Sequence, residues 1–481
     1  MKKVITTKLN IQNNIIIIGA GKVGQECYFM LKDSCYNICF FCDNDRNKQG
    51  KYIDNILIRS IESIRQMDSL STTLIIAVNF LYEKEIEYQL MNMGILLQYV
   101  CIRFSQLCIP KLREYYLETK KSIQNICCES INKFDILYDH QAFMMQTNGG
   151  ISRYFYEIIK RTKEQLTVDW FEGFNYNVYS KNALRVKKTE QYLLGYAELL
   201  NLSILHDFTK NKNYKIYHPT YYKGYGFEDA KTYVVTVHDM IHELYHMDKE
   251  TIKNKKNMIK KADGIIAVSE NTKKDLINIY DIDERNIQVI YHANSLQISC
   301  SEEPIIKGQY ILYVGNRGGY KDAKTLVHAF ANCRYYKDIK LVFFGGGEFT
   351  KEEKELFEEI GIVDYIEWQS GDDTILVNLY QYAELFVYPS LYEGFGIPIL
   401  EAMHYGTPVI TARSSSLTEI GGNAVAYFEP GSYESLAECI DCLLSDSSRR
   451  KELRQAGIKR EKLFSWSKSA KEHINFYRKF L

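Results

Sequence analysis

Three segments of the sequence repeat one pattern, in which an apolar strand-like run is followed by a glycine turn and an amphipathic helical stretch. The segments are NIIIIGAGKVGQECYFMLK, DILYDHQAFMMQTNGGISRYFYEIIKR and YILYVGNRGGYKDAKTLVHAF. Further apolar runs, such as TYVVTVHD, KLVFFGGG and LFVYPS, alternate with longer helical stretches. Such alternation favours parallel sheets with helices on both faces. The sequence therefore predicts an α/β chain built from three doubly wound units.

The order of these segments predicts how the chain divides. About three domains of ordinary size fit into 481 residues. We expect a first α/β domain over residues 1–105, a helical connector over 106–133, a second domain over 134–301, a third over 302–466 and a closing amphipathic helix over 467–481.

Composition and charge exclude several classes of protein. The 60 Lys and Arg residues balance the 60 Asp and Glu residues, so the chain lacks the basic surplus of a general nucleic-acid binder. Twelve scattered cysteines, with no secretory signal at the start, favour a cytoplasmic location. No apolar run approaches the roughly 18 residues that cross a bilayer, so any membrane contact is expected to be peripheral.

The longest functional motif is YPSLYEGFGIPILEAMHYGTPVI in the third unit. Its turn, with Gly394 and Gly396, opens a helix whose unpaired backbone N–H groups favour an anion or sugar hydroxyls. Glu393 and Glu401 flank this turn. Two carboxylates in such a place can bind sugar hydroxyls or act as the acid and nucleophile of a glycosidase. A loop glutamate and a solvated helix glutamate are the alternative without a function.

A second motif, YVGNRGGYKD, places Arg317 and Lys321 after a strand-like run. A nucleoside diphosphate gains negative charge as its bond to a sugar breaks, and two cations stabilise that charge most in the transition state. The alternative is a pair of solvated cations on a surface turn.

Metal-binding spacings also occur, but we expect no metal site. His242, Glu243 and His246 spell H-E-x-x-H, which on a helix binds zinc in metalloproteases. Here the motif follows a strand in an α/β pattern, and the next histidine is His292, so a compact third ligand is not evident. Two C-x-x-C pairs are not expected to bind a metal either. Cys39 and Cys42 lie in a strand-like run, where residues three apart point to opposite faces, and Cys439 and Cys442 are interpreted as buried core residues of a helix.

The first domain carries a nucleotide-binding pattern. Gly19, Gly21 and Gly24 follow an isoleucine run and open a helix, and Asp43 ends the next apolar run. This is the dinucleotide fingerprint: a tight turn, close approach to a phosphate, and an acid for ribose hydroxyls. The segment from Cys42 to Lys51 resembles the Rossmann-like N-terminal domain of bacterial sugar acyltransferases and polysaccharide-biosynthesis dehydratases. That resemblance implies NAD or a nucleotide-sugar as the ligand, with a scaffold that binds nothing as the alternative.

Residues 134–481 resemble a GT-B glycosyltransferase of family 4, especially its members from bacterial surface-polysaccharide biosynthesis. The motifs that carry the resemblance occur in order: Tyr138-Asp139-His140-Gln141, Gly149-Gly150-Ile151-Ser152-Arg153-Tyr154, Val237-His238-Asp239, Gly315 to Lys321, and Glu393-Gly394-Phe395-Gly396 to Glu401. The resemblance implies two facing Rossmann-like, doubly wound domains, here preceded by the extra N-terminal domain.

The resemblance also implies an activity: retaining, metal-independent transfer of a sugar from a nucleotide-sugar to a glycan or lipid-linked acceptor, without a cofactor. The product would be a cell-surface polysaccharide such as lipopolysaccharide or capsule. In matching positions, Arg317 and Lys321 would hold the donor diphosphate, Glu393 with Gly394, Phe395 and Gly396 the donor sugar, and Glu401 the ribose. Gly315 would lie in the donor turn, His238 beside the transferred sugar, Gly149 and Gly150 in the facing turn, and Arg153 on the acceptor side.

Other functions remain open at this stage. The same motifs fit a regulator that binds a nucleotide-sugar without turnover, a phosphorylase or glycosidase that uses Glu393 and Glu401, and a zinc protease through His242, Glu243 and His246. The lysine-rich segment DKETIKNKKNMIKKADG is interpreted as a solvated helix face, with attraction to anionic lipid as the alternative.

Overall fold

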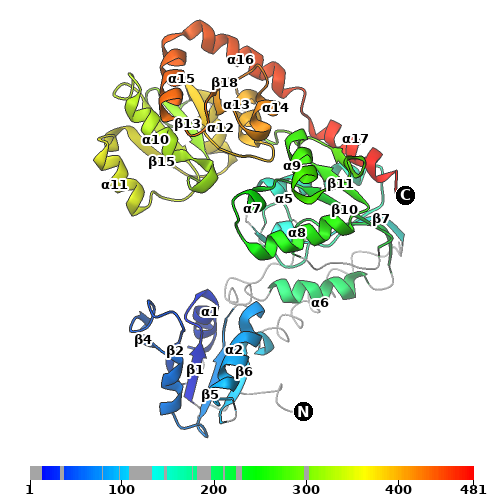
Figure 1. Cartoon of the computed structure of the whole chain (residues 1–481), viewed down its shortest axis with the longest axis vertical. Helices are drawn as coiled ribbons and strands as arrows, with labels where there is room; N and C mark the ends of the chain where they lie inside the picture. Colours follow the sequence, from blue (N-terminus) through cyan, green and yellow to red (C-terminus); the bar gives the residue numbers. More distant parts are fainter. Residues whose placement is uncertain are drawn as a thin grey trace. The chain divides into compact units, whose positions relative to one another are not determined.

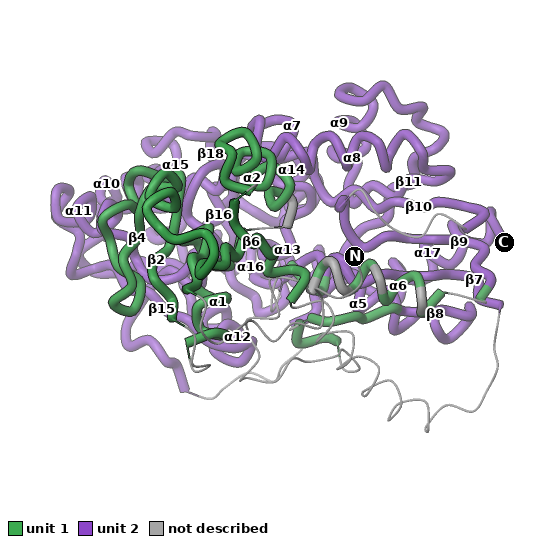
Figure 2. The backbone as a smooth tube through the Cα atoms, turned by 90° about the horizontal axis from the view of Figure 1, so that it is seen from below, with its two compact units in different colours: residues 1–132, 143–147, 171–212 green, residues 133–142, 148–170, 213–481 purple. Residues whose placement is uncertain are grey.

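The computed structural model describes residues 14–32, 37–78, 80–96, 98–107, 133–145, 149–175, 177–180, 197–209, 212–223, 230–296 and 303–481. The chain forms two compact units, drawn in different colours in Figure 2: unit 1 contains residues 1–132, 143–147 and 171–212, and unit 2 contains residues 133–142, 148–170 and 213–481. The helical connector predicted over residues 106–133 lies almost wholly outside the described residues.

Unit 1 is built on a six-stranded sheet with the strand order β3-β4-β2-β1-β5-β6. Its strands are β1 (Asn14–Ile18), β2 (Asn37–Cys42), β3 (Tyr52–Ile53), β4 (Ile56–Arg59), β5 (Thr72–Ile76) and β6 (Val100–Arg103), and its helices include α1 (Lys22–Leu31), α2 (Phe80–Asn92) and α6 (Ala197–Thr209). All neighbours are parallel except β3 and β4, which form an antiparallel pair.

The isoleucine run of β1 explains why this sheet is covered on both faces. Ile15 and Ile17 pack with Tyr28 and Leu31 of α1, whereas Ile16 and Ile18 belong to a separate apolar cluster. That second cluster contains Leu90 of α2. Because successive side chains of a strand point to opposite faces, a continuous apolar run is the pattern of a strand buried on both sides.

The first lobe of unit 2 has a parallel six-stranded sheet in the order β12-β11-β10-β9-β7-β8. Its strands are β7 (Lys133–Tyr138), β8 (Val168–Trp170), β9 (Asn213–His218), β10 (Thr232–Val237), β11 (Gly264–Ala267) and β12 (Ile287–Val289). The accompanying helices are α4 (Gln141–Met145), α5 (Gly150–Thr162), α7 (Ile241–Leu244), α8 (Lys249–Lys261) and α9 (Glu270–Tyr280).

The second lobe of unit 2 has another parallel six-stranded sheet, in the order β15-β14-β13-β16-β17-β18. Its strands are β13 (Tyr310–Val314), β14 (Lys340–Phe344), β15 (Ile366–Gln369), β16 (Leu385–Tyr388), β17 (Val409–Ala412) and β18 (Ala426–Phe428). Its helices are α10 (Ala323–Asn332), α11 (Lys351–Glu359), α12 (Asp373–Tyr382), α13 (Ile397–His404), α14 (Ser415–Gly421), α15 (Tyr433–Ser445) and α16 (Ser447–Glu461). The predicted α/β fold class is confirmed: one sheet lies in unit 1 and one in each lobe of unit 2.

The last helix, α17 (Trp466–Tyr477), follows the second lobe in sequence but packs on α5 of the first lobe (Figure 1). The hydroxyls of Tyr477 and Tyr138 lie 2.9 Å apart, and both side chains are fully buried. None of the described helices is both long enough and apolar enough to cross a membrane.

Candidate functional site

The predicted site residues of unit 2 follow the carboxyl ends of parallel strands. Gly315 to Lys321 come after β13, Glu393 to Gly396 after β16, and His238 after β10. Ligands of parallel α/β sheets bind at this edge, because the loops and helix starts gather there. The positions alone therefore favour a binding function.

Lys321 and Glu393 form the polar centre of the site. The Lys321 ammonium lies 2.7 Å from Glu393 Oε1 and donates a 3.1 Å hydrogen bond to the Tyr388 hydroxyl, and both charged side chains are largely buried. Burial alone would lower the pKa of Lys321, but the Glu393 carboxylate outweighs it and holds that pKa well above its usual range. This position therefore keeps a positive charge at neutral pH.

The loop before α13 is fixed on both sides. Ser415 Oγ accepts the Glu393 N–H at 2.9 Å, and the Ser416 hydroxyl donates to the carbonyl oxygens of Glu393 and Phe395. Gly396 caps α13 with a φ of +97°, a conformation that favours glycine, and a proline follows in the first turn. The loop thus presents the start of α13 in one defined conformation.

Gly394 contacts the first lobe through its backbone. A Cβ atom built on Gly394 would lie 1.7 Å from the carbonyl oxygen of His238. Thr272 Oγ1 of α9 also donates a 3.3 Å hydrogen bond to the Gly394 carbonyl oxygen. The glycine-rich loop of the second lobe therefore meets the loop that follows β10, and only glycine fits at position 394.

Arg317 is not part of the Lys321–Glu393 group. Its guanidinium donates two hydrogen bonds to Glu353, at 2.6 and 3.0 Å, and three more to the carbonyl oxygens of Gly345, Gly347 and Glu348. The side chain is 7% exposed and borders a cavity of about 660 Å³ next to α10 and α11. All five guanidinium N–H groups are used by these contacts.

Glu401 lies in α13, and its carboxylate is buried. It accepts a 3.0 Å hydrogen bond from the Tyr380 hydroxyl, and Arg153 Nη1 of the first lobe lies 3.5 Å from its other oxygen. Burial raises the pKa of Glu401, whereas Arg153 acts to lower it. Hydroxyl groups of a ligand can replace Tyr380 and Arg153 as partners of this carboxylate.

The facing turn, Gly149 and Gly150, begins α5. A Cβ atom on Gly150 would lie 3.8 Å from Ile397 Cδ1, so the starts of α5 and α13 lie side by side. Arg153, one turn further along α5, donates to both carboxylate oxygens of Asp373, at 3.1 and 3.2 Å. The structure therefore brings the two helix starts together with Arg153 and Glu401.

His238 lies at the same contact but is enclosed. Its ring packs against Tyr154 and Phe155 of α5 and against His292, and Nε2 is buried with no hydrogen-bond partner among the described residues. Burial lowers its pKa to about 4, so the ring is neutral at pH 7. Phe395 of the second lobe packs against His292 in a tilted arrangement, with ring centroids 5.0 Å apart.

The glycine turn of unit 1 is tightly packed at two of its three predicted glycines. A Cβ on Gly19 would strike the carbonyl oxygen of Ala77, and one on Gly24 would strike that of Gly19, whereas nothing lies within 4 Å of one on Gly21. Asp43 accepts the Ala20 N–H at 2.8 Å and pairs with Lys48 at 3.1 Å. Burial would raise the pKa of Asp43, but these contacts and the Asp45 N–H hold it below its usual value.

The H-E-x-x-H spacing does not form a helical zinc motif. Helix α7 ends at Leu244, and His246 follows it with a φ of +52°. The Glu243 carboxylate pairs with buried Lys255 at 2.9 Å and accepts a 2.6 Å hydrogen bond from Tyr280. Across the described part of the chain, no group of three or more His, Cys, Asp or Glu residues is arranged to hold a metal ion.

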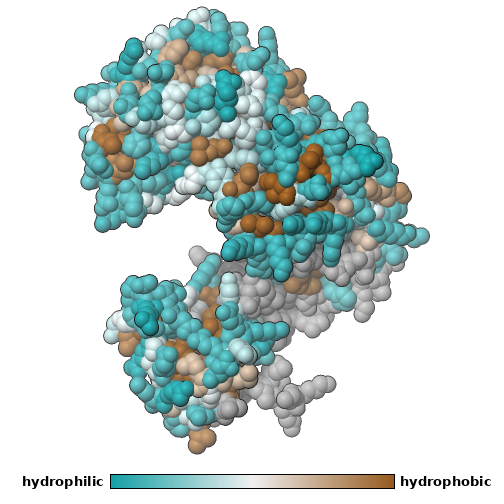
Figure 3. Space-filling view, viewed as in Figure 1, coloured by the Kyte–Doolittle hydropathy of each residue, from teal (hydrophilic) through white to brown (hydrophobic). Residues whose placement is uncertain are grey.

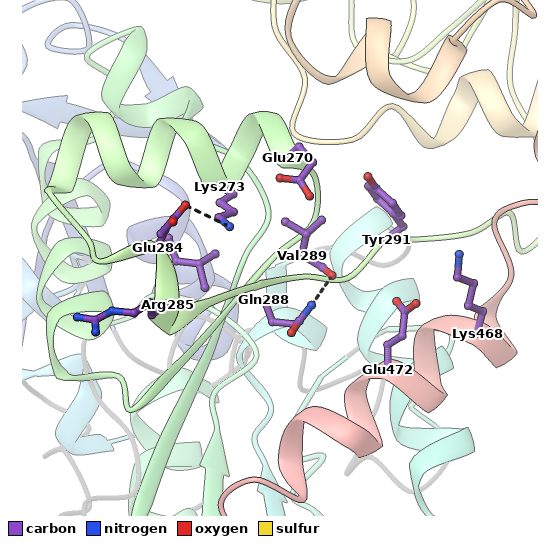
Figure 4. Close-up of a pocket in the computed structure, with 10 residues that line it drawn as sticks. Glu270, Lys273, Glu284, Arg285, Gln288, Val289, Tyr291, Lys468 and Glu472 are labelled. Atoms are coloured by element: carbon purple, nitrogen blue, oxygen red, sulfur yellow. Dashed lines mark hydrogen bonds and ion pairs between the residues drawn. The ribbon is translucent and has the colours of Figure 1, made fainter.

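A second pocket, of about 400 Å³, lies in unit 2 (Figure 4). It is bordered by α9, β12 and α17, and its lining contains acids and bases, including Glu270, Lys273 and Glu472. None of the predicted site residues lines this pocket.

The sequence analysis missed several residues of the site. Tyr388, Tyr380, Asp373, Ser415 and Ser416 all contact predicted residues. Tyr388 ends β16 and so had a positional signal. The other four lie in neighbouring helices, where only the folded structure shows what they touch.

Comparison with known proteins defines the class of protein to which unit 2 corresponds. Residues 148–296 match Glycosyltransferase Family 4, and residues 301–460 match Glycosyl transferases group 1. A crystal structure of Anabaena HepE in complex with UDP and glucose superposes with a TM-score of 0.58 and 15% identity, over 72% of this chain and all of that one. Unit 2 therefore has the GT-B fold, preceded by an additional N-terminal α/β domain.

Two of the proteins that are similar in sequence to this chain are mannosyltransferases. O-antigen chain mannosyltransferase B of Escherichia coli is 27% identical over 56% of this chain and 75% of its own length. An MMP α-(1→4)-mannosyltransferase of Mycolicibacterium hassiacum is 25% identical over 47% of this chain and 57% of its own length. The two family matches cover both lobes and, with the fold, identify residues 148–460 as a GT-B glycosyltransferase region. Residues 11–100 match the family C2185-like, N-terminal.

Proposed function

We propose that the protein is a retaining, metal-independent glycosyltransferase that moves a sugar from a nucleotide-sugar to a glycan or lipid-linked acceptor during synthesis of a cell-surface polysaccharide. The observation that carries this proposal is the buried Lys321–Glu393 pair beside the start of α13. It combines a cation for a diphosphate with a carboxylate for sugar hydroxyls. The likeness to an O-antigen mannosyltransferase supports the product class and makes mannose the first donor sugar to test.

The site suits the departure of a diphosphate. In the proposed reaction the bond between the sugar C1 and the phosphate oxygen breaks, and Lys321 with the positive end of the α13 dipole stabilises the charge that develops on that oxygen. The acceptor hydroxyl attacks C1 from the same face and gives its proton to the departing phosphate oxygen. Retention follows from this geometry, and no separate protein base is needed.

Other residues would orient the donor. Glu393 would bind donor-sugar hydroxyls and Glu401 the ribose hydroxyls, each exchanging a present partner for the ligand. Gly315 has a φ of +130°, and nothing lies within 4 Å of a Cβ built there, so a ligand can approach the backbone. We place neutral His238, together with Gly149 and Gly150, on the side of the transferred sugar.

A donor screen tests the proposal. The full-length protein is incubated with GDP-mannose, UDP-glucose, ADP-glucose and dTDP-glucose in EDTA, and sugar release and transfer are measured with anomeric analysis by NMR. We expect turnover of one donor with retained configuration, and a loss of about a hundredfold or more in the Glu393→Ala variant. Binding of a donor without hydrolysis or transfer to any acceptor would instead favour the regulator.

Residues 1–105, which lie within unit 1, are proposed as an accessory domain that binds a nucleotide such as NAD or a nucleotide-sugar at Gly19, Gly21, Gly24 and Asp43. The open space around Gly21 supports this proposal. Fluorescence titration of the full-length protein and its Gly21→Val variant with NAD(H), UDP-sugars and CoA tests it. Equal affinity of both proteins for all three would favour a scaffold role.

Peripheral membrane contact is proposed through α8. Lys249, Lys253, Lys256 and Lys260 are exposed, and their spacing places them on one side of the helix. The face of α8 drawn in Figure 3 is hydrophilic. Each such lysine contributes up to about 1 kcal/mol of attraction to anionic lipid. Flotation with anionic vesicles at low salt tests this contact, and an unchanged result after replacing all four by Gln would contradict it.

A further inference from the structure

We propose that Arg153, from the first lobe of unit 2, is the second cation for the donor diphosphate, the role that the sequence analysis assigned to Arg317. This inference rests on the proposed function, because it concerns the same donor. It adds a diphosphate contact from the first lobe to a site whose other proposed cation, Lys321, lies in the second.

Arg317 is unsuited to the role because its guanidinium is committed to the protein. Three of its acceptors are backbone carbonyl oxygens, those of Gly345, Gly347 and Glu348. Gly345, Gly346 and Gly347 all have positive φ, so this turn has a specific backbone conformation. The Arg317 guanidinium binds the carbonyl groups that this turn presents. Releasing the arginine to a phosphate would break five hydrogen bonds to these carbonyl groups and Glu353.

Arg153 contacts the second lobe through side chains. Its guanidinium lies 3.1 Å from Asp373 Oδ2 and 3.5 Å from Glu401 Oε1. The Asp373 side chain is 39% exposed, and the contact with Glu401 is long, at 3.5 Å. Side-chain carboxylates can rotate away, and a phosphate offers a guanidinium the same two-oxygen geometry as Asp373 does.

Arg153 also lies beside the proposed phosphate position. Gly150, one turn earlier in α5, contacts Ile397 in the first turn of α13, and Glu401 lies one turn after Ile397. Arg153 therefore contacts α13 one turn from its start, where the positive end of the helix dipole favours an anion.

Charge balance requires such a residue. Lys321 is paired with Glu393, so this pair alone does not offset the charge of a diphosphate. When ribose hydroxyls bind Glu401, they replace Arg153 there, and the released guanidinium gains a phosphate partner. Ribose and phosphate binding are then coupled through one arginine.

The experiment compares nucleoside diphosphates with nucleosides. Calorimetric titration of the full-length protein with UDP, GDP and ADP selects the ligand, and the matching nucleoside is titrated in parallel. We expect Arg153→Gln to weaken diphosphate binding by about 10- to 100-fold and nucleoside binding by less than about threefold. Arg161→Gln, on the same helix but paired with Glu157, is the matched control and should bind both as the unaltered protein does.

A second variant, at Asp373, is expected to change diphosphate binding in the opposite direction. Asp373→Asn removes a carboxylate that competes with phosphate for Arg153, so diphosphate binding should strengthen by a few fold. If Arg153 only bridges the two lobes, Asp373→Asn should instead weaken both ligands, and Arg153→Gln should weaken diphosphate and nucleoside equally. Either pattern, or unchanged diphosphate binding in Arg153→Gln, overturns the inference. Failure of the unaltered protein to bind any nucleoside diphosphate would contradict the proposed function itself.

Discussion

The hydroxyls of Tyr138 and Tyr477, 339 positions apart in the sequence, share a buried hydrogen bond of 2.9 Å. Tyr477 also bonds to His218 Nδ1 at 2.7 Å, and the other ring nitrogen of His218 bonds to Thr236. Helix α17 thus completes a polar network inside the first lobe. The buried histidines of this lobe and of α17 have no carboxylate partner among the contacts described above. Their protonation therefore determines how the protein responds to acid.

Acid is expected to unfold the protein at unusually mild pH. Burial lowers the pKa of both His238 and His473 to about 4, and those of His218 and His292 well below 6.5. The unfolded chain binds these protons near pH 6.5, so the stabilisation is complete above that pH and is lost as the pH falls towards 4. Urea unfolding at pH 7.5, 6.0 and 5.0 should show a drop of several kcal/mol in total. A flat profile over this range would contradict the buried, neutral histidines.

Lys321→Ala is expected to lower sugar transfer by about a hundredfold or more while leaving the fold intact. The variant removes the positive charge beside Glu393 and leaves the Glu393 carboxylate without its cation. Lys324→Ala, three positions along the chain at an exposed site in α10, is the matched control. Initial rates and circular dichroism of both variants test this prediction, and a near-normal rate for Lys321→Ala would refute its role.

Gly394→Ala should impair both stability and donor binding. The added methyl group would overlap the His238 carbonyl oxygen, so one of the two loops must move. Gly318→Ala is the control, because a Cβ there meets nothing within 4 Å and its φ is −88°. We expect a lower Tm and weaker nucleotide binding for the first variant only. Equal melting temperatures would show that the loops do not meet as described.

The buried Lys255–Glu243 pair gives a stability prediction. Lys255 is fully buried and donates to Glu243 and to the Asp239 carbonyl oxygen at 2.5 Å. Replacing it alone by Met should cost about 3–5 kcal/mol, because the Glu243 charge loses its partner. The double variant Lys255→Met with Glu243→Gln should recover much of that loss. Denaturant unfolding measures both, and a double variant no more stable than the single one would contradict the pairing.

The sequence was sufficient for the fold class and for the central pair of the site. Apolar runs and glycine turns are local signals, and they predicted the three α/β units. Lys321 and Glu393 were both candidates, and the structure brings them into contact. The predicted positions of both follow parallel strands, whose carboxyl ends necessarily share one edge of a sheet.

The hydrogen-bond and ion-pair partners of the charged residues could not be predicted in the same way. Nothing near Arg317 in the sequence shows that Glu353 and a glycine turn after β14 would surround it. The lysine-rich segment had a solvated helix face as its default interpretation, yet Lys255 within it is buried against Glu243. Such pairings depend on how helices settle on a sheet, and charged residues in the sequence look alike whether they end up exposed or enclosed.

The return of α17 to the first lobe also constrains the order of events during synthesis. A ribosome makes the strands of that lobe long before it reaches position 477, so Tyr138 and His218 must wait for a hydroxyl that is added near the end of translation. Until then the lobe lacks α17, and completing its polar network depends on the second lobe having been made first.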